Sequence, residues 1–228
     1  MKLFIVATPI GNLEDFSKRA KETLEQVDLI LAEDTRQTAK LLNFFNIKKP
    51  IISYHQHSKL IKLERIKGFL FDNKNLALVC DSGTPGISDP AGELVDFLDK
   101  EIPQIEIVPI PGPSAIISAL SVCGFSASQF LFAGFPPTKT KRKKFFETTL
   151  KYPKTIVFYE SPFRLFKTFE NIREEFRNNN QKRKVFVIKE ISKIFEKSWR
   201  GEIDEIIKNL KNENIRGEFV IILSQIFK

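Results

Sequence analysis

The stretch Asp81-Ser82-Gly83-Thr84-Pro85-Gly86-Ile87-Ser88-Asp89-Pro90 decides how the first half of this chain is organised. It follows the apolar run 76–80, which is short and sharply bounded enough to predict a buried strand. It precedes a segment with helical spacing, 91–100, which Ser88 or Asp89 can cap and for which Pro90 suits the first position. A glycine-rich loop between a strand and a helix is a common ligand site in open α/β sheets, and a tight turn that binds nothing is the alternative.

Strand-like and helix-like segments alternate on both sides of this loop. Strands are predicted at 2–7, 27–33, 51–53, 76–80 and 105–109, and helices at 16–26, through Leu41 and Phe45, and at 59–72, 91–100 and 115–122. This alternation predicts a mostly parallel sheet that is covered on both faces. The loops after parallel strands lie along one edge of a sheet, so segments 8–12, 33–36, 81–89 and 111–115 can share one cleft.

The second half of the chain has a different order of elements. Strands are predicted at 130–135, 154–159, 185–190, 195–201 and 217–224, with one helix starting at Ser161-Pro162 and another at 202–211. Leu165, Phe169, Ile172 and Phe176 have the spacing of one buried helical face. This order predicts a mixed sheet in a second domain. We therefore expect an α/β protein with domains at 1–112 and 113–228.

The composition indicates a chain with a substantial core and a basic surface. The sequence has 228 residues, 42% of them hydrophobic, and a formal net charge of +8. A positive charge favours an anionic partner such as RNA, although the abundance of Lys, Asn, Ile and Phe that a coding bias produces explains it equally well. The two cysteines lie in apolar runs and are expected to be reduced core residues. The start of the chain lacks the pattern of a signal peptide, and no apolar stretch is long enough to span a membrane, so we expect a cytoplasmic protein.

Nucleotide hydrolysis, standard dinucleotide binding and serine hydrolysis are disfavoured, because their motifs are missing from the sequence. The loops contain no Gly-Lys-Ser/Thr phosphate loop, no G-x-G-x-x-G fingerprint and no G-x-S-x-G nucleophile elbow. His55-Gln56-His57 is a conceivable metal pair, but the chain has no other histidine, so we expect no metal and assign His55 to the loop or to substrate contact. Loops rich in backbone donors, small residues and proline suit a ligand held by main chain, and adenosine-containing cofactors fit that description.

Seven segments, in order along the whole chain, resemble those of the ribosomal RNA small-subunit methyltransferase I family, within the tetrapyrrole methylase superfamily. They are Thr8–Leu13, Ala32–Arg36, Ser53–His55, Asp81–Pro90, Pro111–Ala115, Phe158–Pro162 and Gly217–Val220. The resemblance implies a two-domain α/β fold with S-adenosylmethionine in a cleft between the domains. It also implies a homodimer that methylates the ribose 2′-oxygen of a cytidine in the decoding region of 16S rRNA.

The resemblance also implies which residues contact the cofactor. Carried over by position, these are Ile10, Asp81, Thr84, Gly86, Ile87, Ser114, Ala115 and Tyr159, with Gly217 and Glu218 closing the pocket. Two positions depart from the family's pattern, Phe163 and Gln37, where histidine is usual. If either histidine bound RNA or moved a proton, that role is absent or relocated in this chain.

Methyl transfer to a ribose hydroxyl benefits from a base, because the hydroxyl is weakly acidic. Glu33 and Glu160 are the expected catalytic residues, with Asp34, Lys189 and Glu190 as further candidates; a structural salt bridge or helix cap is the alternative for each. Arg36 and Arg164 could hold a phosphate or orient the base. The basic run Lys139, Lys141, Arg142, Lys143 and Lys144 is the first candidate for RNA contact, and Arg177, Lys182, Arg183 and Lys184 are the second. A solvated loop is the alternative for the run.

Two other functions compete with rRNA methylation. A relative that methylates a small tetrapyrrole would share the cofactor site and need no basic surface. A catalytically silent RNA-binding protein would keep the basic surface and take up no cofactor. Assays with small-subunit RNA and with precorrin-type substrates separate the first rival, and cofactor binding separates the second.

Overall fold

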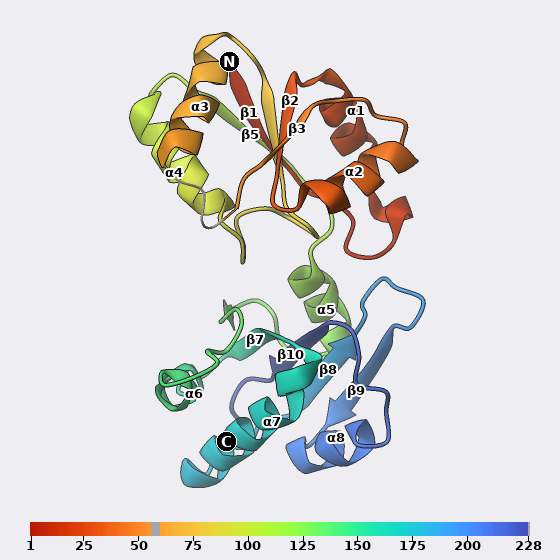
Figure 1. The fold of residues 1–228 in the computed structure, drawn as a ribbon. Helices are drawn as coiled ribbons and strands as arrows, with labels where there is room; N and C mark the ends of the chain where they lie inside the picture. Colours follow the sequence, from red (N-terminus) through yellow and green to blue (C-terminus); the bar gives the residue numbers. More distant parts are fainter. Residues whose placement is uncertain (56–59, 228) are drawn as a thin grey trace. The chain divides into compact units, whose positions relative to one another are not determined.

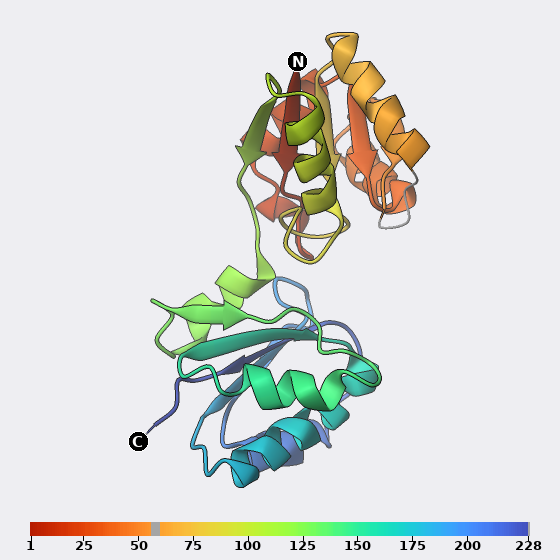
Figure 2. The same ribbon diagram turned by 90° about the vertical axis from the view of Figure 1, so that its left-hand side faces the viewer.

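The computed structural model describes residues 1–55 and 60–227, and the chain divides into two compact units, Met1–Ser114 and Ala115–Lys228. Each unit contains one five-stranded sheet with helices packed against it (Figure 1, and from a second side in Figure 2). The expected division at residue 112 lies in the segment between the last strand of the first unit and the first helix of the second. Cys80 and Cys123 are buried free thiols. No helix in the described ranges is long and apolar enough to cross a membrane.

The first unit is a parallel sheet built in the predicted alternation. Its elements are β1 (Lys2–Val6), the 3₁₀ turn η1 (Leu13–Asp15), α1 (Lys18–Gln26), β2 (Leu29–Ala32), α2 (Thr35–Phe44), β3 (Ile51–Ser53), α3 (Leu60–Phe71), β4 (Leu76–Val79), α4 (Ala91–Glu101) and β5 (Glu106–Ile110). The strand order is β3-β2-β4-β1-β5, and all four neighbouring pairs are parallel. The predicted parallel sheet is confirmed.

Helices cover both faces of this sheet. Apolar side chains of α1 and α2, such as Leu24 and Leu42, pack with Val6 on one face. Side chains of α3 and α4, such as Leu70, pack with Leu3 on the other face. The strands therefore read as nearly continuous apolar runs, because both faces are buried.

The second unit is a mixed sheet, as the order of its elements predicts. Its elements are α5 (Ala115–Cys123), β6 (Phe130–Phe132), α6 (Arg142–Thr149), β7 (Thr155–Glu160), the 3₁₀ turn η2 (Pro162–Arg164), α7 (Leu165–Asn178), β8 (Val185–Lys189), β9 (Lys197–Gly201), α8 (Ile203–Leu210) and β10 (Phe219–Leu223). The strand order is β6-β7-β10-β8-β9; β6 and β7 are parallel and the other neighbours are antiparallel.

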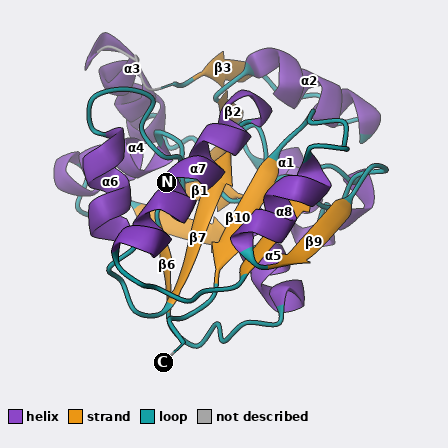
Figure 3. Cartoon of the chain, turned by 90° about the horizontal axis from the view of Figure 1, so that it is seen from below, coloured by secondary structure: helices purple, strands orange, loops and turns teal. Residues whose placement is uncertain are grey.

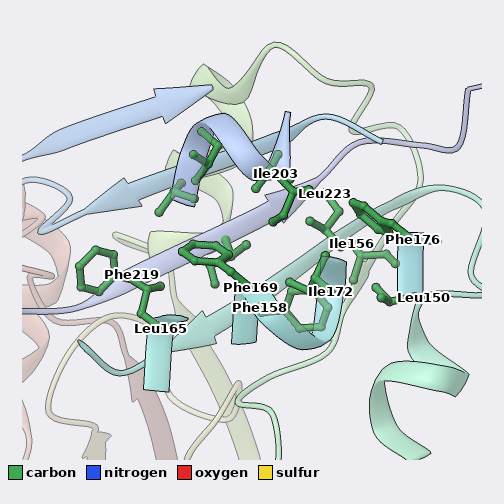
Figure 4. Close-up of a cluster of buried hydrophobic side chains, with 14 of the residues drawn as sticks. Leu150, Ile156, Phe158, Leu165, Phe169, Ile172, Phe176, Ile203, Phe219 and Leu223 are labelled. Carbon is green, nitrogen blue, oxygen red and sulfur yellow. The ribbon is translucent and has the colours of Figure 1, made fainter. Parts of the chain in front are cut away.

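One face of the second sheet carries the largest apolar cluster of the described residues. Helices α6, α7 and α8 contribute Phe146, Phe169 and Leu210, which pack on strand residues such as Phe158 (Figure 4; Figure 3 shows α7 and α8 across the strands). The predicted apolar stripe of α7 lies in this cluster. Full burial of each such side chain contributes about 1.5–3 kcal/mol. Helix α5 packs against the opposite face.

The prediction missed helix α6. No helix was predicted at the basic run 139–144, for which a solvated loop was the alternative to RNA contact, but Arg142, Lys143 and Lys144 form the first turn of α6. Three cations in a first turn oppose the helix macrodipole, so the local sequence gives no helix-start signal. The helix forms because Phe146 and Leu150 are buried, each with about 1% of its surface exposed.

Candidate active site at the strand ends

The loops that follow the strands of the first unit meet at one edge of its sheet, as predicted. The backbones of Thr8 and Gly83 pair, with the Thr8 N–H donating to Gly83 O at 2.9 Å and the Gly83 N–H to Thr8 O at 3.2 Å. The Thr84 hydroxyl donates to Pro113 O at 3.2 Å, and the Asp34 N–H donates to Asp81 Oδ1 at 3.0 Å. These bonds tie the segments after β1, β2, β4 and β5 into one surface.

The loop 81–90 is shaped by Asp89 and by glycine. The Asp89 carboxylate accepts the Gly86 N–H at 2.9 Å and the Ala91 N–H at 2.9 Å, so it closes the loop and caps α4. Helix α4 begins at Ala91 with Pro90 at its N-cap, one residue later than predicted, and Asp89 bonds its first N–H from the preceding position. Gly83 and Gly86 have φ values of +82° and +90°, which side chains disfavour. A Cβ at Gly83 would lie 3.3 Å from Ile10 Cγ2, whereas the space beside Gly86 is open, and Ile87 next to it is half-exposed.

The carboxylates of Glu33, Asp81 and Asp89 gather at this edge, and none of them forms an ion pair within residues 1–55 and 60–227. Partial burial raises the pKa of Glu33, and the negative charges of Asp81 and Asp89 raise it further. Asp34 differs, because hydrogen bonds from Arg36 lower the pKa of that carboxyl to about 2. The Arg36 guanidinium is bound to Asp34 at 2.7 Å, so this predicted substrate contact is exposed but already paired. The edge therefore carries a negative field that a cationic ligand would neutralise.

The second unit holds the remaining predicted cofactor contacts. The half-buried Tyr159 ring lies 5.0 Å from Phe132 and 5.3 Å from Phe135, centroid to centroid. At Gly217, φ is +92°, and the Glu190 carboxylate fills the space that a Cβ would need.

Glu190 holds the segment that contains Gly217. Its Oε1 accepts the Glu218 N–H at 3.0 Å and the Lys193 ammonium at 2.9 Å. Burial raises the pKa of Glu190, but the hydrogen bonds from Lys193 and the Glu218 backbone outweigh that effect and leave it lowered. The sequence made Glu190 a further candidate base. In the structure its carboxylate instead holds the backbone at Gly217 and Glu218 in place.

Glu160 does not fit the expected role of a catalytic base. Its side chain is fully buried, with Arg164 Nη2 at 2.8 Å from Oε1 and the Thr168 hydroxyl hydrogen-bonded to Oε2. Arg142 Nη2 lies 4.0 Å from the same Oε2. A fully buried carboxylate enclosed by two arginines and a hydroxyl cannot reach a substrate hydroxyl. The structure corrects this prediction and assigns Glu160 to the scaffold.

Arg142 is likewise a buried residue rather than an RNA contact. Only 5% of it is exposed, and its guanidinium donates to Asn171 Oδ1 at 2.8 Å, to Pro137 O at 3.0 Å and to the Thr168 hydroxyl at 2.6 Å. Burial lowers its pKa, and the neighbouring Glu160 charge partly restores it. Lys139, Lys141, Lys143 and Lys144 are exposed and keep the predicted position for RNA contact.

Arg183 and the two histidines were further candidate site residues. Arg183 is 1% exposed and donates to four backbone carbonyls, so it cannot contact RNA. His55 is exposed, and His57 lies outside the described residues. Within residues 1–55 and 60–227, no group of three or more His, Cys, Asp or Glu side chains is placed to hold a metal ion.

The family model for tetrapyrrole (corrin/porphyrin) methylases matches residues 2–207. The chain belongs to this family. Two solved methyltransferases share the fold: a cobalt precorrin-4 methyltransferase (TM-score 0.67, 18% identity, 98% of this chain and 94% of that one) and uroporphyrin-III C-methyltransferase from Thermus thermophilus (TM-score 0.64, 15% identity, 98% and 94%). At these identities the likeness describes the fold alone.

Sequence relatives within the family are much more similar to this chain. A Thermotoga maritima protein named ribosomal RNA small subunit methyltransferase I is 42% identical over 98% of both chains. Proteins of the same name from Bacillus subtilis and Synechocystis are 42% and 41% identical over 97% of this chain and 74% and 78% of theirs. The chain is therefore a methyltransferase, and its methyl donor is S-adenosylmethionine.

The residues at the strand-end edge fit this donor. S-adenosylmethionine carries a sulfonium and an ammonium, and the carboxylates of Glu33, Asp81 and Asp89 provide the negative field that such a cation needs. Apolar Ile10 and Ile87 and the open space beside Gly86 suit the approach of an adenosine.

Proposed function

We propose that this methyltransferase acts on the ribose 2′-oxygen of a cytidine in the decoding region of 16S rRNA. One observation carries the proposal. Over nearly its full length, the chain is 42% identical to relatives named for small-subunit rRNA methylation. The exposed lysines at the start of α6 support an RNA substrate, because clustered cations bind the phosphate backbone. A ribosomal substrate would place the reaction in the cytoplasm.

The proposed cofactor contacts are those that the resemblance to the family implies. The first unit would contribute Ile10, Asp81, Thr84, Gly86, Ile87 and Ser114, and the second unit Ala115, Tyr159, Gly217 and Glu218. When bound, S-adenosylmethionine supplies a methyl group already activated on a positive sulfur. The chain then has to align that methyl with the hydroxyl and to exclude water, which accounts for a large part of the rate.

Glu33 is the proposed acceptor of the ribose hydroxyl proton. Its carboxylate is only partly buried, and the raised pKa makes it a stronger proton acceptor than an ordinary glutamate. Asp81 and Asp89 would act through Glu33 by keeping its pKa raised. His55 and Arg36, exposed near the same strand ends, are proposed substrate contacts.

The test is to map ribose methylation in small-subunit RNA from cells with and without the protein, and to repeat the reaction with purified components. One cytidine should lose its 2′-O-methyl group without the protein and regain it on addition. Methyl transfer to a precorrin-type substrate, with none to RNA, would overturn the proposal. Parallel reactions on naked 16S RNA and on the assembled subunit identify the form that is modified.

We also propose that the protein works as a homodimer. Helix α5 exposes Ile117 and Val122, with 57% and 53% of their surfaces accessible, and apolar residues on one helix favour association. Light scattering on the purified protein should give twice the chain mass. A monomeric mass at the concentration of the methylation assay would reject the dimer without affecting the proposed reaction.

A further inference from the structure

Phe163 is the most exposed aromatic side chain among the described residues. It lies in η2, between β7 and α7, with 97% of its surface accessible. Exposed apolar residues are common, so exposure alone assigns no role. The surroundings of Phe163 give it one.

The turn that carries Phe163 is fixed by the buried Glu160 cluster. Arg164 pairs with Glu160 at 2.8 Å, donates to Pro136 O at 2.8 Å, and donates to Ser161 Oγ at 3.2 Å. Pro162 occupies the start of the turn and restricts its backbone further. An aromatic ring on a backbone held this firmly loses little conformational entropy when it binds a partner.

Exposed lysines lie on the helices next to this turn. Arg142 at the start of α6 bonds Thr168 and Asn171 of α7, so the first turn of α6 packs beside the first half of α7. Lys139, Lys141, Lys143 and Lys144 are exposed at that end of α6, and Lys167 is exposed on α7. Within segments 139–147 and 163–170 the carboxylates are Glu147, 3.9 Å from Lys143, and the exposed Glu170, so the five lysines outnumber them.

Apart from the ion pair between Lys143 and Glu147, the cations at the start of α6 do not stabilise that helix. Positive side chains at a helix N-terminus are unfavourable by about 0.3–1 kcal/mol each at low salt, and the first turn of α6 has no acidic residue to compensate. Interfaces between proteins are depleted in lysine, whereas surfaces that bind single-stranded nucleic acid combine cations with exposed aromatic rings. The combination favours RNA as the partner.

We propose that Phe163 stacks on an unpaired nucleobase of the RNA substrate while the lysines of α6 and Lys167 contact the flanking phosphates. The Phe163 surface is defined by Phe163, Lys139, Lys141, Lys143, Lys144 and Lys167. This inference rests on the proposed function, because it specifies how an RNA substrate is held. Stacking accepts any base, so the surface positions a single-stranded segment and does not read its sequence.

The test uses fluorescence anisotropy with two 12-nucleotide probes: an oligocytidylate, and an oligomer of the same length with abasic sites. Phe163→Ala should weaken binding of the oligocytidylate by about 5- to 100-fold, since stacking on one ring contributes that much. Phe163→Trp should restore it. The abasic oligomer should bind the wild type and Phe163→Ala equally, because no base is present to stack.

Phe71→Ala is the matched control. Phe71 ends α3 in the first unit and is 51% exposed, so this variant removes a similar ring from outside the proposed RNA-binding surface. Equal oligocytidylate affinity of Phe163→Ala and wild type would overturn the inference. A halved molecular mass of Phe163→Ala, with unchanged RNA affinity, would also overturn it and would assign the ring to a contact between copies of this chain.

Methylation of 16S RNA and cofactor binding by calorimetry separate this inference from the proposed function. If Phe163→Ala binds oligocytidylate normally while the wild type methylates 16S RNA, the inference fails and the proposed function stands. If the wild type methylates no RNA but Phe163→Ala loses affinity for oligocytidylate and keeps it for the abasic probe, the proposed function fails and the stacking surface stands.

Discussion

Glu33 and Glu160 stand at the ends of strands in the two units, yet their neighbours give them opposite properties. Glu33 follows β2, is partly exposed and lies among carboxylates that raise its pKa. Glu160 ends β7, is fully buried and is enclosed by Arg142, Arg164 and Thr168. A buried carboxylate whose charge is balanced by arginines serves the scaffold. A carboxylate that has no such partner is available to bind a cationic ligand or a proton.

If Glu160 serves the scaffold, the protein should need it for a stable fold. Glu160→Ala leaves the buried Arg142 and the partly buried Arg164 without their carboxylate, so the free energy of unfolding should fall by about 3–5 kcal/mol in urea denaturation. Glu170→Ala, an exposed glutamate on α7, is the control and should change stability by less than about 0.5 kcal/mol. A stable Glu160→Ala protein that has lost methyl transfer would return Glu160 to the chemistry.

A third strand-end glutamate, Glu190, lies between these two cases, because Lys193 pairs with its carboxylate. Gly217→Ala would drive a Cβ into the Glu190 carboxylate at a positive φ, so we expect a loss of about 2 kcal/mol in stability and weaker cofactor binding by calorimetry. Gly134→Ala has a similar backbone, with φ of +63°, but open space for the Cβ. It should cost about 1 kcal/mol from backbone strain alone. Equal losses in the two variants would show that the Glu190 contact has no effect.

Glu33→Gln tests the carboxylate whose charge no cation compensates in an ion pair among the described residues. A carboxyl whose pKa is raised in the folded state contributes stability at low pH that is lost as the pH rises through that pKa. The glutamine variant should therefore match or slightly exceed wild-type stability at neutral pH, by less than about 1 kcal/mol because the group is partly exposed. Methyl transfer should fall about 100-fold or more if Glu33 is the base.

The pKa of Glu33 can be followed directly in an Asp81→Asn variant. Removing the Asp81 charge should lower the pKa of Glu33 in an NMR titration, because that charge is one of the two that raise it. An unchanged titration would show that the Asp81 charge does not raise the pKa of Glu33, which would leave burial and Asp89 as its causes. Wild-type turnover in Glu33→Gln would remove Glu33 from the mechanism.

The smallest effect on folding is expected at the lysines around Arg142. Lys141 and Lys144 are exposed, so replacing both by alanine should leave stability nearly unchanged and reduce the salt slope of RNA binding by about 1.4, for two single-strand phosphate contacts. Lys208 in α8 and Lys211 directly after it are also exposed, and replacing both is the control, with no expected change in slope. An equal change in both variants would show that the charge effect is not local to α6.

Much of the fold follows from local pattern. The alternation of apolar runs and helical spacing predicted the parallel sheet of the first unit and the mixed sheet of the second. The bond that Asp89 makes at the start of α4 also followed, because its oxygen needs only the neighbouring backbone N–H groups. Helix α6 was missed because its first turn carries cations that oppose helix formation, and burial of Phe146 and Leu150 overrides that signal.

The candidate site was predictable in its loops and less so in its charges. Strand ends in a parallel sheet must meet at one edge, so Thr8, Gly83 and Pro113 could be expected to lie together. Whether a charged side chain points into the core depends on partners far along the sequence. Arg142 is buried through bonds to Thr168 and Asn171, and nothing in its own basic run sets it apart from the exposed lysines.

The sequence by itself determined the two sheets, the glycine-rich loop at the centre of the first one, and the family whose motifs these segments carry. These features depend on apolar periodicity and on backbone conformations, which act between near neighbours. Only the tertiary structure decided that Glu160 and Arg142 are buried partners and that Glu33 and Phe163 are accessible. Burial and charge compensation are set by groups brought together from distant parts of the chain, and no local pattern specifies them.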